Sequence, residues 1–83
     1  MKLVLIEWLD AHAGRGWQTI ERIEQAAEPL YCRSVGWLLR ETKECKVIAP
    51  HLAGEKNPAT ILQASGDLTI PTRCITRLTV LKR

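Results

Sequence analysis

Apolar and polar side chains alternate along residues 31–52, which indicates two β-strands joined by a charged turn. Val35, Trp37 and Leu39 recur with a period of two, so they share one face of the first strand, and we expect that face to lie in the core. Gly36 lies inside the same strand, where a missing side chain predicts the close approach of another backbone segment. Residues 31–52 therefore indicate the type of fold but no particular function.

The other extended segments add strands to this pair. Residues 2–10 predict a first strand that is apolar on both faces, which favours a central position covered by a second layer or by a partner chain. Further short strands are predicted at residues 60–64, 68–70 and 74–81. Loops and turns are predicted at residues 10–16, 41–46, 53–59 and 65–67.

Residues 19–28 are the helix-capable segment. Ile20 and Ile23 have helical spacing, Thr19 is a suitable N-cap, and Pro29 is expected to end the helix. These elements predict a mainly β protein, in which residues 1–83 form a single domain. Its expected architecture is a small, strongly bent antiparallel barrel of five to six strands with one short helix.

The composition favours a folded protein that associates with itself. A chain of 83 residues buries only about 60–65% of its unfolded surface, so its core is marginal and oligomerisation would help it. The apolar run at residues 3–6 is far shorter than the roughly 20 residues that span a bilayer, and it does not resemble a signal peptide. Cys32, Cys45 and Cys74 then predict free thiols in a reducing cytoplasm.

The net charge of +3 favours anionic partners. Basic side chains surround the hairpin at residues 33–46 and gather again at residues 73–83. Such residues also serve to keep strand edges soluble, so the charge alone does not define a nucleic-acid surface.

Reactive side chains are present without a catalytic signature. The candidates for nucleophile, base and acid are Cys32, Ser34, His12, His51, Asp10 and Asp67. No glycine elbow surrounds a serine and no phosphate-binding loop is present, so we expect neither an enzyme nor a cofactor. Zinc sites usually draw two ligands from one close pair, and this chain has no such cysteine pair, so no metal site is expected.

The tryptophans are more informative, because the chain has three of them and no phenylalanine. Trp8 shares a face with Val4 and Ile6 and is expected in the core. Trp17 follows the glycine-containing loop around Arg15 and has two interpretations. It is either a platform on which a ligand base stacks, or a lid that closes one end of the barrel.

The segment GDLTIPTRCITRL at residues 66–78 resembles the end of Src-homology-3-like and Sm-like barrels, where an Ile-Pro step enters one helical turn before the last strand. The whole chain resembles short uncharacterised accessory proteins of tailed bacteriophages. The matching motifs are Trp8 with Asp10, residues 34–38, residues 50–52 and residues 66–71. The resemblance implies a phage product that acts in the host cytoplasm, by binding rather than by catalysis.

Binding and sequestration of a host factor is therefore the expected function. The first candidate partner is an anionic small molecule, such as a signalling nucleotide used in host defence, held in pockets between subunits of a homo-oligomer. The expected ligand-binding residues are Trp17, Arg33, Ser34, His51, Asp67 and Thr69. The alternatives are a small barrel that binds nucleic acid and a protein–protein inhibitor of a host enzyme, and a membrane partner is not expected.

Overall fold

The computed structural model describes residues 1–57 and 60–83, which form a mainly antiparallel β structure. Its elements are β1 (Leu3–Asp10), α1 (Ile20–Gln25), β2 (Leu30–Glu41), β3 (Cys45–Ala49), β4 (His51–Gly54), β5 (Ile61–Ser65), β6 (Leu68–Pro71), the 3-10 turn η1 (Thr72–Cys74) and β7 (Ile75–Lys82). The mainly β class and the short helix are thus confirmed. Within the described residues, no helix is long and apolar enough to cross a membrane.

The main sheet has five strands in the order β6-β3-β2-β1-β7, and β4 and β5 form a separate two-stranded hairpin. The predicted count of five to six strands is therefore wrong, since the described residues contain seven. The second of the two strands predicted within residues 31–52 is divided at Pro50 into β3 and β4. Ala53 and Gly54, predicted in a loop, belong to β4, while residues 58–59 of that loop lie outside the described residues. Within the part of the chain that the structure describes, no ladder joins the edge strands β6 and β7, so the sheet does not close into the predicted barrel.

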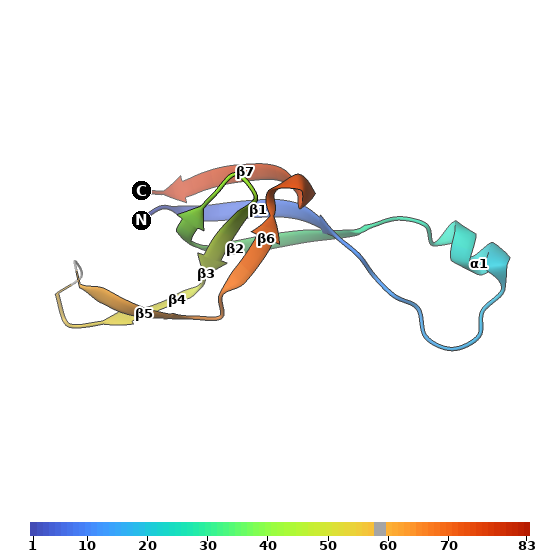
Figure 1. Cartoon of the computed structure of the whole chain (residues 1–83), viewed down its shortest axis with the longest axis horizontal. Helices are drawn as coiled ribbons and strands as arrows, with labels where there is room; N and C mark the ends of the chain where they lie inside the picture. The colour runs from blue at the N-terminus through green and yellow to red at the C-terminus, as the bar shows by residue number, and fades with distance from the viewer. Residues whose placement is uncertain (58–59) are drawn as a thin grey trace.

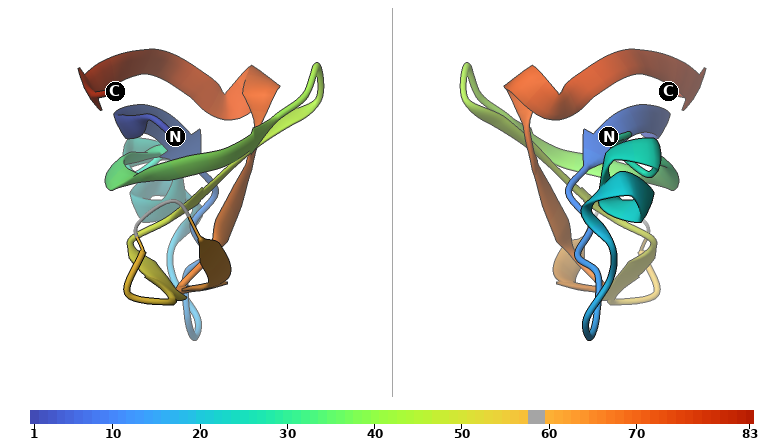
Figure 2. Two further views of the ribbon diagram at one scale, coloured as in Figure 1. Left: turned by 90° about the vertical axis from the view of Figure 1, so that its left-hand side faces the viewer. Right: turned by 90° about the vertical axis from the view of Figure 1, so that its right-hand side faces the viewer.

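The sheet is nevertheless strongly bent. Seen from its ends, β6 runs from the hairpin up to η1, where the chain turns into β7 (Figure 2). The helical turn predicted after the Ile-Pro step is present at Thr72–Cys74. The Thr72 N–H donates to the Glu44 carbonyl at 2.8 Å, so this turn is fastened to the turn between β2 and β3.

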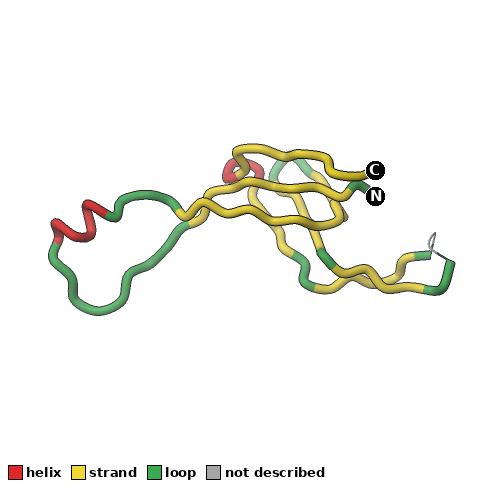
Figure 3. The backbone as a smooth tube through the Cα atoms, turned by 180° about the vertical axis from the view of Figure 1, so that it is seen from behind, coloured by secondary structure: helices red, strands yellow, loops and turns green. Residues whose placement is uncertain are grey.

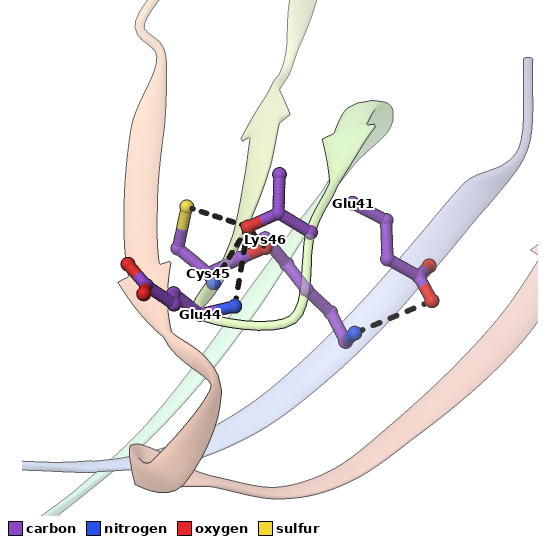
Figure 4. A network of polar contacts seen from close by, with 5 residues as sticks. Glu41, Glu44, Cys45 and Lys46 are labelled. Carbon is purple, nitrogen blue, oxygen red and sulfur yellow. Dashed lines mark hydrogen bonds and ion pairs between the residues drawn. The ribbon is translucent and has the colours of Figure 1, made fainter.

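That β2–β3 turn is shorter than predicted, because β2 continues to Glu41 and β3 begins at Cys45. The Thr42 hydroxyl accepts hydrogen bonds from the backbone N–H groups of Glu44 and Cys45, at 3.2 and 3.1 Å. Beside it, Lys46 Nζ pairs with Glu41 Oε1 at 3.4 Å (Figure 4). A side-chain oxygen that satisfies two turn donors is the usual role of threonine at such positions.

The core is small and lies on one face of the sheet. Val4, Ile6, Ile48 and Ile70 are fully or almost fully buried and form one cluster. Trp8 packs against this cluster, as predicted. The alternate residues of β1, which include Leu3, Leu5 and Leu9, are only partly buried. The prediction that β1 is central is confirmed, since it lies between β2 and β7, but the described residues bury only one of its two apolar faces.

The prediction that Val35 and Trp37 face the core is wrong. Val4 lies opposite Gly36 and Leu5 lies opposite Val35, and directly opposed residues of an antiparallel pair share a face. Gly36 therefore belongs to the core face, and Val35 is 51% exposed on the other. The close approach predicted at Gly36 is confirmed, since a Cβ built there would lie 3.1 Å from the backbone of Ala49.

Between β1 and β2 the chain leaves the sheet and forms a long excursion, residues 11–29, which we call the arm (Figures 1 and 3). Every residue from 10 to 31 is exposed. The radius of gyration is 16.9 Å, whereas a compact domain of this length has about 12 Å. The arm and the β4–β5 hairpin project from opposite ends of the sheet and account for this elongation (Figure 1).

Helix α1 lies in the arm and is shorter than predicted. The Thr19 side chain caps it as expected, accepting from the Arg22 N–H at 3.3 Å. The helix ends at Gln25, well before Pro29, and it buries none of its described residues. A short helix without packing is marginal, which explains why it does not extend to the proline. A hydrogen bond from the His12 ring nitrogen Nε2 to the Glu28 carbonyl joins the two limbs of the arm.

Candidate functional site

The six predicted ligand-binding residues do not form one site within a single chain. Trp17 lies in the arm, on the segment that leads into α1, at the opposite end of the molecule from the β4–β5 hairpin (Figure 1). Arg33 and Ser34 are neighbours in β2 and therefore point to opposite faces of the sheet. His51, Asp67 and Thr69 lie around the base of the hairpin.

Trp17 has a fully exposed side chain, at 103% of its reference accessibility. The interpretation of Trp17 as a lid over one end of a barrel is therefore wrong. A tryptophan side chain offers roughly 150–250 Å² for burial, and here that surface faces water. Ile20, at 73% exposure, and Ile23, at 54%, continue this apolar surface along the arm. The structure thus places the Trp17 ring where none of the described residues covers it.

Arg33 lines an open hollow of about 500 Å³ at the end of the β1–β2 ribbon. The other lining residues are Glu7, Trp8, Leu9, Tyr31, Cys32 and Thr76. Arg33 Nε lies 3.5 Å from Glu7 Oε1, and the arginine side chain is 79% exposed. Tyr31 is also exposed, at 72%. An arginine beside an aromatic ring is able to pair with a phosphate and stack against a base, and the sequence analysis did not single out Tyr31.

Ser34 has a structural partner. Its hydroxyl accepts a hydrogen bond from Trp8 Nε1 at 3.0 Å, on the core face of the sheet. The indole N–H of a partly buried tryptophan needs such an acceptor, and Ser34 supplies it across the β1–β2 pair.

Replacing Ser34 with alanine is therefore expected to lower the free energy of unfolding by about 1 kcal/mol, which lowers the melting temperature by roughly 4–8 °C. Adding Trp8→Phe removes the donor as well, so the two losses should not be additive. Thermal unfolding of the two single variants and the double variant measures this coupling. A Ser34→Ala protein that melts with the wild type would contradict the structural role.

His51 and Asp67 both lie at the base of the hairpin. His51 is the first residue of β4 and pairs with Ser65 in β5. Gly66, with a φ of +76°, turns the chain into β6 and packs so closely that an added Cβ would lie 3.2 Å from the Pro50 ring. Asp67 follows this turn and is exposed, as are His51 and Thr69. None of these three residues lines the hollow that contains Arg33.

The cysteines and the other possible metal ligands are spread over several elements. Within residues 1–57 and 60–83, no group of three histidine, cysteine or acidic side chains is placed to hold a metal ion. Cys32, Cys45 and Cys74 are free thiols, as predicted, and each is partly buried.

Comparison with known proteins does not assign the chain to a class. No family model, no curated protein and no solved structure matches it. The features that bear on function are therefore the arm, the hollow lined by Arg33, and the exposed apolar face of β1 and β2 that carries Leu5 and Val35.

Proposed function

We propose that this protein is a binding protein without catalytic activity, which sequesters an anionic small molecule of nucleotide size and works as a homo-oligomer. The observation that carries the proposal is the fully exposed Trp17 on a projecting arm, which lies at the opposite end of the molecule from the hairpin that begins at His51 (Figure 1). A second copy is the simplest means of combining the arm of one chain with the hollow of another.

The hollow has suitable chemistry for such a ligand. Its volume of about 500 Å³ falls within the roughly 300–1,000 Å³ that small-molecule sites occupy. Arg33, whose side chain is 79% exposed, pairs with Glu7, and ion pairs in contact with water contribute about 0.2–1 kcal/mol. A phosphate can therefore displace the Glu7 carboxylate at little cost, while Tyr31 or a Trp17 ring from another copy stacks on the base.

Thermal shift in the presence of ATP, a cyclic dinucleotide or inorganic phosphate tests this proposal. At a ligand concentration of about 100 times Kd, binding adds roughly 2.7 kcal/mol to the stability of the folded state. We expect one nucleotide to raise the melting temperature of the wild type. We expect no rise for Trp17→Ala, and circular dichroism should show that this variant keeps the wild-type fold, because the ring is fully exposed within a single chain.

Gln18→Ala is the matched control, since Gln18 is an exposed neighbour in the same segment, and it should respond to the nucleotide as the wild type does. A wild type that responds to none of these compounds would contradict the proposed ligand class. A strong response that falls steeply with salt and grows with oligonucleotide length would instead support nucleic-acid binding.

A second candidate is a protein inhibitor that blocks a host enzyme, in keeping with the resemblance to phage accessory proteins. Its specific support is the apolar surface left uncovered on the sheet, where Leu5 is partly exposed and Val35 is 51% exposed. A stable complex with one host protein, formed by a chain that responds to no nucleotide, would favour this function.

A further inference from the structure

Two apolar surfaces of this chain lack a cover, and they lie on different parts of the molecule. One is on the arm, where Trp17, Ile20 and Ile23 are exposed. The other is the outer face of the main sheet, which we define as the face opposite the core on β1, β2 and β7. Its members, from the strand pairing, include Leu3, Leu5, Glu7, Arg33, Val35, Trp37 and Arg77.

We propose that the arm of one copy docks on the outer face of the sheet in a second copy, so that two chains cover each other reciprocally. The arm does not cover the outer face of its own sheet. It leaves the end of β1 and returns to the start of β2, pointing away from the strands (Figure 1). A second copy offers the same outer face in an orientation that the first arm can reach.

Charge complementarity favours this occupant. The arm carries Arg15 and Arg22 against three glutamates, so its net charge is −1. Because the whole chain carries +3, the rest of the chain carries +4. The acidic arm would repel a nucleic-acid partner, whereas the sheet of another copy attracts the arm.

The pattern of side chains matches at residue level as well. Ile20 and Ile23 are three positions apart in α1, and so are Glu21 and Glu24, which gives an apolar stripe beside an acidic one. On the outer face, Leu5 lies opposite Val35 in the strand pairing. One step further along the strands, Glu7 lies between Arg33 of β2 and Arg77 of β7. The apolar stripe of α1 can thus pack on Leu5 and Val35 of the outer face. Its glutamates can pair with the two arginines, for which Glu7 also competes.

A reciprocal contact of this kind gives a closed two-fold dimer, in which each contact occurs twice. It also brings the arm of one copy, which carries Trp17, to the sheet that carries Arg33 in the other. The docking itself requires no nucleotide, so it can be tested separately from the proposed function.

Reversing the charge on the arm or on the outer face tests this docking. Sedimentation velocity, in low salt and without nucleotide, measures the oligomeric state of each variant. We expect a dimer or larger even-numbered species for the wild type. Glu21→Arg with Glu24→Arg places positive charge on the arm, and Arg33→Glu with Arg77→Glu places negative charge on the outer face. Each double variant alone should sediment as a monomer, and an equimolar mixture should restore the dimer, because both of its contacts are again between opposite charges.

Two further variants keep the result interpretable. Lys43→Glu with Lys56→Glu makes the same change in net charge as the outer-face variant at exposed positions away from the main sheet's outer face, and it should dimerise as the wild type does. Ile23→Ser changes no charge and should weaken the dimer. Circular dichroism should show the same fold for every variant. A monomeric wild type, variants that dimerise on their own, or a mixture that stays monomeric would each overturn the proposed docking.

Discussion

Replacing Ile6 with alanine is expected to unfold most of the protein near physiological temperature. Ile6 is completely buried at the centre of the main sheet and is one of only five buried hydrophobic residues in the described part of the chain. Removing such a side chain costs about 2–5 kcal/mol, because the transfer energy is lost and a cavity remains. A core of this size rarely contributes more than about 3–5 kcal/mol of net stability.

Thermal unfolding followed by circular dichroism measures this loss. A fall of at least roughly 10 °C in melting temperature is expected, since each kcal/mol shifts a domain of this size by about 4–8 °C. Leu30→Ala is the control, because Leu30 is a large apolar residue with 51% exposure at the start of β2. Equal melting temperatures for the two variants would contradict the placement of the core.

Replacing Gly36 with valine is the second change with a large expected effect. The Cβ alone would lie 3.1 Å from three backbone atoms of Ala49, the last residue of β3. Backbone cannot move aside as the end of a side chain can, so β2 and β3 must separate where the sheet bends. Overpacking of this kind costs about 1–3 kcal/mol and occasionally more.

The matched control is Gly14→Val. Gly14 is exposed in the arm, and the nearest atom to its Cβ would be the terminal amide nitrogen of Gln18, which can rotate away. We expect a normal melting temperature for Gly14→Val and a fall of roughly 5–20 °C for Gly36→Val. A Gly36→Val protein that melts with the wild type would show that the two backbones do not approach each other as described.

The positions of the strands were largely predictable, because period-two alternation is a local property of the sequence. Which face of β2 is buried was not predictable, since apolar residues occupy both faces of the β1–β2 pair. Val35 and Trp37 are more hydrophobic than Ser34 and Gly36, so their face of β2 was wrongly expected in the core. Gly36 indicated the correct face, because the backbone of Ala49 approaches it closely on the side that packs inward.

The candidate site was less predictable than the fold. The spacing of Ile20 and Ile23 predicted that both lie on one side of a helix. It did not predict that both side chains are exposed in the structure. The sequence left Trp17 with two interpretations, a platform and a lid, and the lid is excluded only by its full exposure in the structure. The structural partner of Ser34 was not predictable, because Trp8 is 26 residues away in the sequence.

Native mass spectrometry of protein purified without denaturant tests both the oligomer and its ligand, since it reports subunit number and any retained small molecule together. We expect an even-numbered oligomer that carries additional mass of nucleotide size, and we expect Trp17→Ala to lose that mass. A bare monomer of the wild type would contradict both the reciprocal docking of the arm and the intersubunit ligand site.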